Sequence, residues 1–141
     1  MMLRNRIFCV IGVIGLCVTT GLYADEAETE MGKEMAAASK KLKSLRTLPR
    51  DDFDAAAIAV RKSHEALLRS MAHTPALIAE MPEGIEKQKA LADSRRLLGL
   101  SYAALCELEI AYLDKDDAKV KSVMAQIKQL KKEGHKKYTD D

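Results

Sequence analysis

The stretch LADSRRLLGLSYAALCELEIAY, residues 91–112, decides the fold class of this chain. Apolar or small side chains recur in it at alternating intervals of three and four residues, the spacing of one face of an α-helix. These side chains are Leu91, Ser94, Leu98, Ser101, Leu105, Leu108 and Tyr112. The stretch therefore predicts a long amphipathic helix whose apolar stripe has to be buried against other helices.

Three other segments carry stripes with the same spacing. Their side chains are Met31, Met35, Ala38, Leu42 and Leu45; then Phe53, Ala57, Val60, His64, Leu67 and Met71; and last Val120, Met124, Ile127, Lys131 and His135. The connections at 47–50 and 114–116 are short, and short connections make neighbouring helices antiparallel. We therefore expect an all-α, up-down-up-down antiparallel four-helix bundle, with the longer connection 74–84 folding over one of its ends.

The first 24 residues have a different character. Arg4 and Arg6 precede an apolar run over 7–18, and Ala24 occupies a position that a signal peptidase reads. The run is too short to span a bilayer as a permanent anchor. We predict a cleaved signal peptide over 1–24, a bundle domain over 25–141, and a periplasmic product without a stable membrane anchor.

The charge balance and the cysteine content limit the classes of function that the chain can have. The chain has 23 Lys and Arg against 21 Asp and Glu, and the excess of two is Arg4 and Arg6 in the leader. The processed chain is then balanced, so the composition gives no support for nucleic-acid binding. Of three cysteines only Cys106 follows the leader, which excludes an internal disulfide, and we expect it to be a buried thiol in an apolar stripe.

The histidines do not form the motifs of common metalloenzymes. No His-Glu-x-x-His or Cys-x-x-Cys occurs in the sequence. Arginine, serine and lysine stand three residues before His64, His73 and His135, where a di-iron bundle has glutamate. No glycine-rich phosphate loop follows a strand. The sequence therefore predicts a protein that is not an enzyme.

One pair of residues points to a cofactor. In an up-down-up-down bundle the start of the first helix lies beside the end of the last, so Met35 and His135 would face each other at that end. A thioether and an imidazole are the axial ligands of some electron-transfer haems. Taken singly, Met35 would be a core side chain and His135 a solvated histidine among lysines.

Residues 35–45 (MAAASKKLKSL) resemble the first helix of the soluble cytochrome b562 family, and residues 126–138 (QIKQLKKEGHKKY) resemble its last helix. The resemblance implies a bundle that holds one non-covalent haem b between Met35 and His135. It implies one-electron transfer to an unidentified redox partner protein. Haem c is excluded, because KKEG precedes His135 where a Cys-x-x-Cys-His motif would be needed.

The chain departs from the family at the haem pocket. Lys131 occupies the position of an arginine near a haem propionate, which keeps the charge but loses the bidentate fork. Ser94 and Leu98 occupy positions where the family has phenylalanines, so we expect Leu98 to line the haem and binding to be weaker.

Alternatives remain open at this stage. His64 or Met31 could replace Met35 as a ligand, and His73 is expected to support free carbonyls at the end of the second helix. A competing hypothesis is a haem-free periplasmic helical bundle that binds another protein or stress-damaged chains.

Overall fold

The computed structural model describes residues 29–139, and all regular elements in this part of the chain are helical. The long helices are α1 (Glu30–Ser44), α2 (Phe53–Ser70), α4 (Ile85–Leu113) and α5 (Asp117–Tyr138), with a 3₁₀ turn η2 (Leu45–Thr47) and a short α3 (Ala76–Ala79). The all-helical prediction is confirmed for these residues. The predicted leader, 1–24, lies outside them. Across 29–139 no helix combines the length and apolar character needed to cross a membrane.

Side-chain caps set where three helices begin. Thr29, Asp52 and Asp116 precede α1, α2 and α5, and each side chain accepts a hydrogen bond from the backbone N–H three residues on, at 2.9, 3.0 and 2.9 Å. Such caps satisfy amides that have no partner inside the helix. At the other end of α4, Lys115 adopts a left-handed φ of 56°, which makes the short turn into α5 possible.

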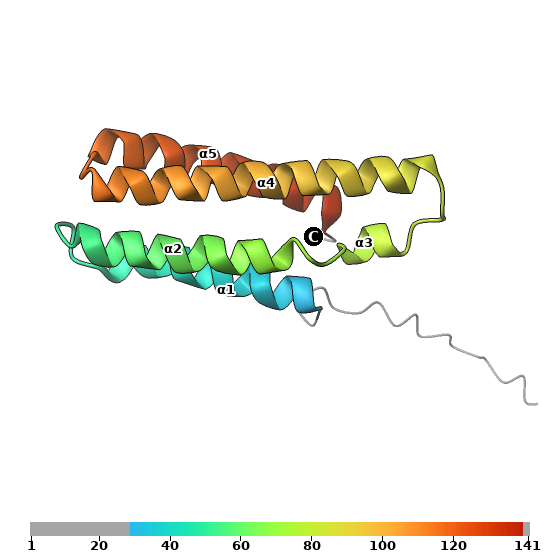
Figure 1. Cartoon of the computed structure of the whole chain (residues 1–141), viewed down its shortest axis with the longest axis horizontal. Coiled ribbons are helices and arrows are strands. Elements are labelled where there is room, and N and C mark those ends of the chain that lie inside the picture. The colour runs from blue at the N-terminus through green and yellow to red at the C-terminus, as the bar shows by residue number, and fades with distance from the viewer. Residues whose placement is uncertain (1–28, 140–141) are drawn as a thin grey trace, which may run out of the picture.

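The long helices pack in the order of the chain. α1 packs against α2, α2 against α4 and α4 against α5. Figure 1 shows α1 with α2 in one layer and α4 with α5 in the other. In the part of the chain described, α1 and α5 make few or no close backbone contacts with each other. The side of the bundle between these two helices is therefore its least closely packed side.

One core joins all four long helices. Its buried members are Ala38 of α1, Val60, Ala66 and Leu67 of α2, Leu98, Ala104, Leu105 and Leu108 of α4, and Val123 of α5. Burying a Val or Leu side chain contributes about 1.5–3 kcal/mol. The predicted stripes of α1, α2 and α4 all face this core, as expected.

The stripe of α5 follows the prediction in its first half, where Val120, Met124 and Ile127 pack against the core, and departs from it in the last turns. Val123 is only 2% exposed and Leu130 packs against the core, whereas Lys131 is exposed and His135 is half-buried. Burying the Lys131 ammonium without a partner would be unfavourable, because the desolvation free energy of the charge exceeds the free energy gained by packing its side chain. α5 therefore turns its larger apolar side chains inward. Lys131 and His135 consequently lie at the edge of the stripe.

The connection between α2 and α4 contains α3, at the end of the bundle where α4 begins (Figure 1). Ile78 of α3 is fully buried, and α3 packs against both α4 and α5. The connection therefore covers part of this end, as predicted.

Candidate functional site

Met35 lies on α1, half-buried and packed against the core. Its Sδ accepts a hydrogen bond from the hydroxyl of buried Ser70 at 3.5 Å, while the same hydroxyl lies 2.7 Å from the carbonyl oxygen of Leu67. A hydroxyl has one proton to donate, and the carbonyl is the closer and stronger acceptor. The Met35 sulfur thus has only a weak hydrogen-bond partner, the Ser70 hydroxyl, and a metal ion could take the place of that partner.

His135 lies near the end of α5, half-buried, in a groove of about 660 Å³. The other residues that line the groove are Lys128, Lys131, Lys132, Lys136 and Thr139. Intervals of three and four residues place the lysines on one side of the helix with the imidazole. The groove is therefore strongly basic and suits an anionic group placed beside His135.

The groove opens on the side of α5 that is turned away from α4. Glu133 and Lys137 stand two residues before and after His135, and two residues correspond to more than half a turn of an α-helix. Both of these side chains interact with residues of α4. His135 therefore points away from α4, and the residues that line its groove all belong to α5 except Thr139, which follows it, so Met35 is not among them.

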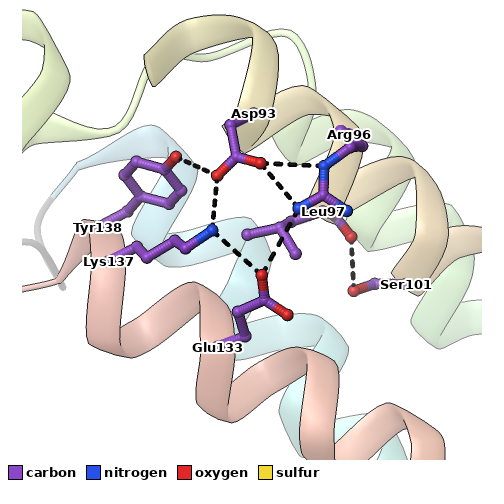
Figure 2. Close-up of polar contacts among 7 residues, drawn as sticks. All are labelled: Asp93, Arg96, Leu97, Ser101, Glu133, Lys137 and Tyr138. Atoms are coloured by element: carbon purple, nitrogen blue, oxygen red, sulfur yellow. Dashed lines mark hydrogen bonds and ion pairs between the residues drawn. The ribbon is translucent and has the colours of Figure 1, made fainter. Parts of the chain in front are cut away.

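A polar network around Asp93 fixes the last turns of α5 to α4 (Figure 2). The Asp93 carboxylate accepts hydrogen bonds from the Tyr138 hydroxyl at 2.6 Å, Lys137 Nζ at 3.0 Å and Arg96 Nη2 at 2.7 Å. Glu133 joins the same network, 3.1 Å from Lys137 Nζ and 3.5 Å from Arg96 Nη2.

The network persists over the ordinary pH range. The hydrogen bonds from Tyr138, Lys137 and Arg96 hold the pKa of Asp93 well below its usual range. Burial and the bond to Asp93 raise the pKa of Tyr138 to about 12. Asp93 is therefore ionised and Tyr138 protonated at neutral pH, and their hydrogen bond connects the last turn of α5 to α4.

His64, the predicted rival to Met35, is engaged elsewhere. Its Nε2 lies 2.8 Å from Glu109 Oε2, and its ring meets Tyr102 edge-on at 5.4 Å. Arg61 Nη2 lies 2.6 Å from the other oxygen of Glu109. Burial opposes ionisation of Glu109, but the hydrogen bonds from His64 and Arg61 outweigh it and leave the pKa of this carboxyl lowered. His64 thus belongs to an ion-pair network between α2 and α4 that the sequence stripes did not reveal.

The other predicted site residues lie either in the core near Met35 or in the groove beside His135, except His73. Leu98 is buried in the core against which Met31 and Met35 pack. Lys131 is exposed and shares the groove with His135. His73 is exposed beyond the end of α2, outside both sets.

Met35 and His135 do not form part of a metal-binding cluster of side chains in the described residues. Among residues 29–139 no group of three or more His, Cys, Asp or Glu side chains is arranged to hold a metal ion. A haem supplies four nitrogens to its iron and takes axial ligands, such as a methionine and a histidine, from the protein. One thioether and one imidazole are thus a chemically sufficient set.

Comparison of the chain with family models, with curated proteins and with solved structures finds no match.

Proposed function

We propose that this chain is an exported electron-transfer protein of the cytochrome b562 type, holding one non-covalent haem b in a periplasmic, up-down-up-down four-helix bundle. The observation that carries the proposal is the basic groove beside half-buried His135 near the end of α5. The leader-like composition of residues 1–24 supports export.

The topology is supported by the packing order of the helices and by two short connections. Residues 45–52 join α1 to α2, and residues 114–116 join α4 to α5. Connections of this length favour antiparallel neighbours. The start of α1 and the end of α5 then belong to the same end of the bundle, which is what ligation by Met35 and His135 requires.

Each residue has a distinct role in this proposal. Met35 and His135 would provide the two axial ligands, and Lys131 would attract a propionate through its ammonium group. Leu98 and the neighbouring core would exclude water, and the Asp93 network would hold the turn that carries His135. When bound, haem b supplies a one-electron ferric–ferrous couple, and the unidentified redox partner exchanges electrons with it by outer-sphere contact.

Substitution of the ligands tests the proposal. His135→Ala removes the stronger ligand and should abolish tight haem binding. Met35→Ala should retain haem but convert the ferric iron to high spin and lower the potential, because a methionine ligand raises it. His64→Ala is the control and should leave the absorption and EPR spectra unchanged.

The opposite pattern would contradict the assignment. If His64→Ala produces high-spin iron while Met35→Ala changes nothing, the site is bis-histidine and α1 supplies no ligand. If the unsubstituted protein takes up no haem, the chain is a haem-free bundle that binds another protein.

A further inference from the structure

The outer face of α4 is unusually apolar for a surface. Residues 97–106 (LLGLSYAALC) include no charged side chain, and in the middle of α4 both faces are nonpolar. On the inner face Leu97, Leu98 and Leu105 are buried, but on the outer face Leu100 is 43% and Ile110 57% exposed. A helix that is apolar all round is normally covered all round. Within residues 29–139 only the inner face is covered.

A second stripe runs along this outer face. Its members, spaced by three or four residues and all exposed, are Ile85, Lys89, Ala92, Arg96, Leu100, Ala103, Glu107, Ile110 and Asp114. The basic members precede the apolar middle and the acidic members follow it. The two halves are symmetric: Lys89 and Asp114 are equally far from the midpoint of residues 101 and 102, and so are Arg96 and Glu107.

We propose that this stripe, the α4 outer stripe, binds a second copy of the chain. The two α4 helices would lie antiparallel about a two-fold axis at residues 101–102. Arg96 of each copy then faces Glu107 of the other, and Lys89 faces Asp114, so that each pair occurs twice. A parallel alignment would instead place like charges side by side. This self-complementarity identifies a second copy as the occupant.

The residues near the axis allow close approach. Gly99 stands inside α4, where glycine costs about 1 kcal/mol relative to alanine. A Cβ at this position would meet no atom within 4 Å, so packing within the described chain gives no reason for glycine. Gly99 and exposed Ala103 are four residues apart, a spacing that lets two helix backbones pack closely.

Competing ion pairs within the chain are weak. Arg96 also contacts Asp93 at 2.7 Å and Glu133 at 3.5 Å, Lys89 contacts Glu86 at 2.9 Å and Glu107 contacts Lys119 at 3.4 Å. The side chains of Arg96, Lys89 and Glu107 are each about half exposed or more. Exposed pairs contribute about 0–1 kcal/mol, so the same groups can be shared across an interface. One helix face is smaller than a standard protein interface, so the dimer should be weak and concentration-dependent. The inference goes beyond the proposed function and does not depend on haem.

Sedimentation equilibrium of the whole exported protein over a wide concentration range tests the proposal. The unsubstituted chain should show a monomer–dimer equilibrium. Ala103→Glu brings two carboxylates together near the axis and should weaken association about tenfold or more. Ala125→Glu, at an exposed alanine of α5, is the matched control and should have no effect. Circular dichroism confirms that both variants fold.

A charge exchange tests the antiparallel register. Lys89→Asp and Asp114→Lys should each weaken association several-fold by placing like charges together, and the double variant should restore it. A chain that is monomeric at every concentration overturns the proposal, as does a dimer insensitive to Ala103→Glu. A double variant that associates no better than the single variants overturns the antiparallel alignment.

Discussion

At the scale of single residues, the side chains around the proposed haem site differ in how firmly they are held. The Met35 sulfur has only a long hydrogen bond from Ser70, whereas His64 has a short contact with Glu109. A side chain that has to give up a hydrogen bond to bind iron loses less free energy when that hydrogen bond is weak. This difference favours the Met35 sulfur over His64 Nε2 as the second ligand beside His135, while His64 Nδ1 is buried and has no hydrogen-bond partner among the described residues.

Lys131→Ala should lower haem affinity about two- to fivefold, because an exposed charge interaction contributes about 0.2–1 kcal/mol. The spin state should not change, since the ammonium would act on a propionate and not on the iron. Haem transfer to a competing apoprotein measures the affinity. Lys121→Ala, exposed on α5 outside the groove, is the control. A change of spin state in Lys131→Ala would show that the groove is not a propionate site.

Asp93→Asn should destabilise the protein at neutral pH by about 1 kcal/mol, the range of partly exposed ion pairs. The folded-state pKa of Asp93 is lowered, so its contribution is fully present above the unfolded value of about 3.9 and is lost as pH falls below that value. The difference between the two proteins should therefore shrink between about pH 4 and pH 2. Urea unfolding across this range measures it, and a difference that is constant in acid would contradict the role given to Asp93.

At the scale of elements, the apolar period predicted the buried faces of α1, α2 and α4 and the first half of that of α5, where Val120, Met124 and Ile127 pack against the core. In α1, α2 and α4 large apolar residues recur from one end of the stripe to the other, with small residues between them, so the buried face follows from spacing. After Leu130 the sequence of α5 offers no large apolar residue before Tyr138. The spacing predicts that the stripe continues through Lys131 and His135, but these two residues lie at its edge.

Contacts between side chains far apart in the sequence could not be predicted from it. The pairing of Asp93 with Tyr138 and of His64 with Glu109 depends on how each helix is rotated and how far it is shifted along its neighbour. Neither quantity is encoded in local spacing. The positions of Met35 and His135 near helix ends could be predicted, because the order and connections of the helices are visible in the sequence, whereas their joint binding of a haem stays a prediction.

Gly134→Ala should stabilise the last turns of α5 by about 0.5–1 kcal/mol, because alanine replaces glycine inside a helix. A Cβ at Gly134 would meet nothing within 4 Å, so no clash opposes the gain. Thermal unfolding and slower amide exchange in residues 131–138 measure the effect. Gly99→Ala should give a similar gain in monomer stability but weaken self-association, which separates the two glycines. Destabilisation by Gly134→Ala would mean that these turns are not regular helix.

At the scale of the whole molecule, stability depends on one core shared by four helices. Leu108 is fully buried in it, whereas Leu68 is exposed on α2. Leu108→Ala should cost about 2–5 kcal/mol through lost burial and the cavity left behind. Leu68→Ala, the same change at the surface, should cost about 0.5 kcal/mol or less. Guanidinium unfolding measures the free energy of unfolding of both variants. Equal decreases would show that Leu108 does not lie in the core.

The most direct test of the central claim is the absorption spectrum of the protein expressed with its leader, purified and supplied with haem. The account predicts one haem per chain, a sharp Soret band and, after reduction, the narrow α and β bands of low-spin b-type iron. Carbon monoxide should bind poorly because Met35 and His135 fill both axial positions, and acid acetone should extract the haem. A high-spin spectrum with ready carbon monoxide binding would contradict the two-ligand site, and a protein without any Soret band would contradict haem binding itself.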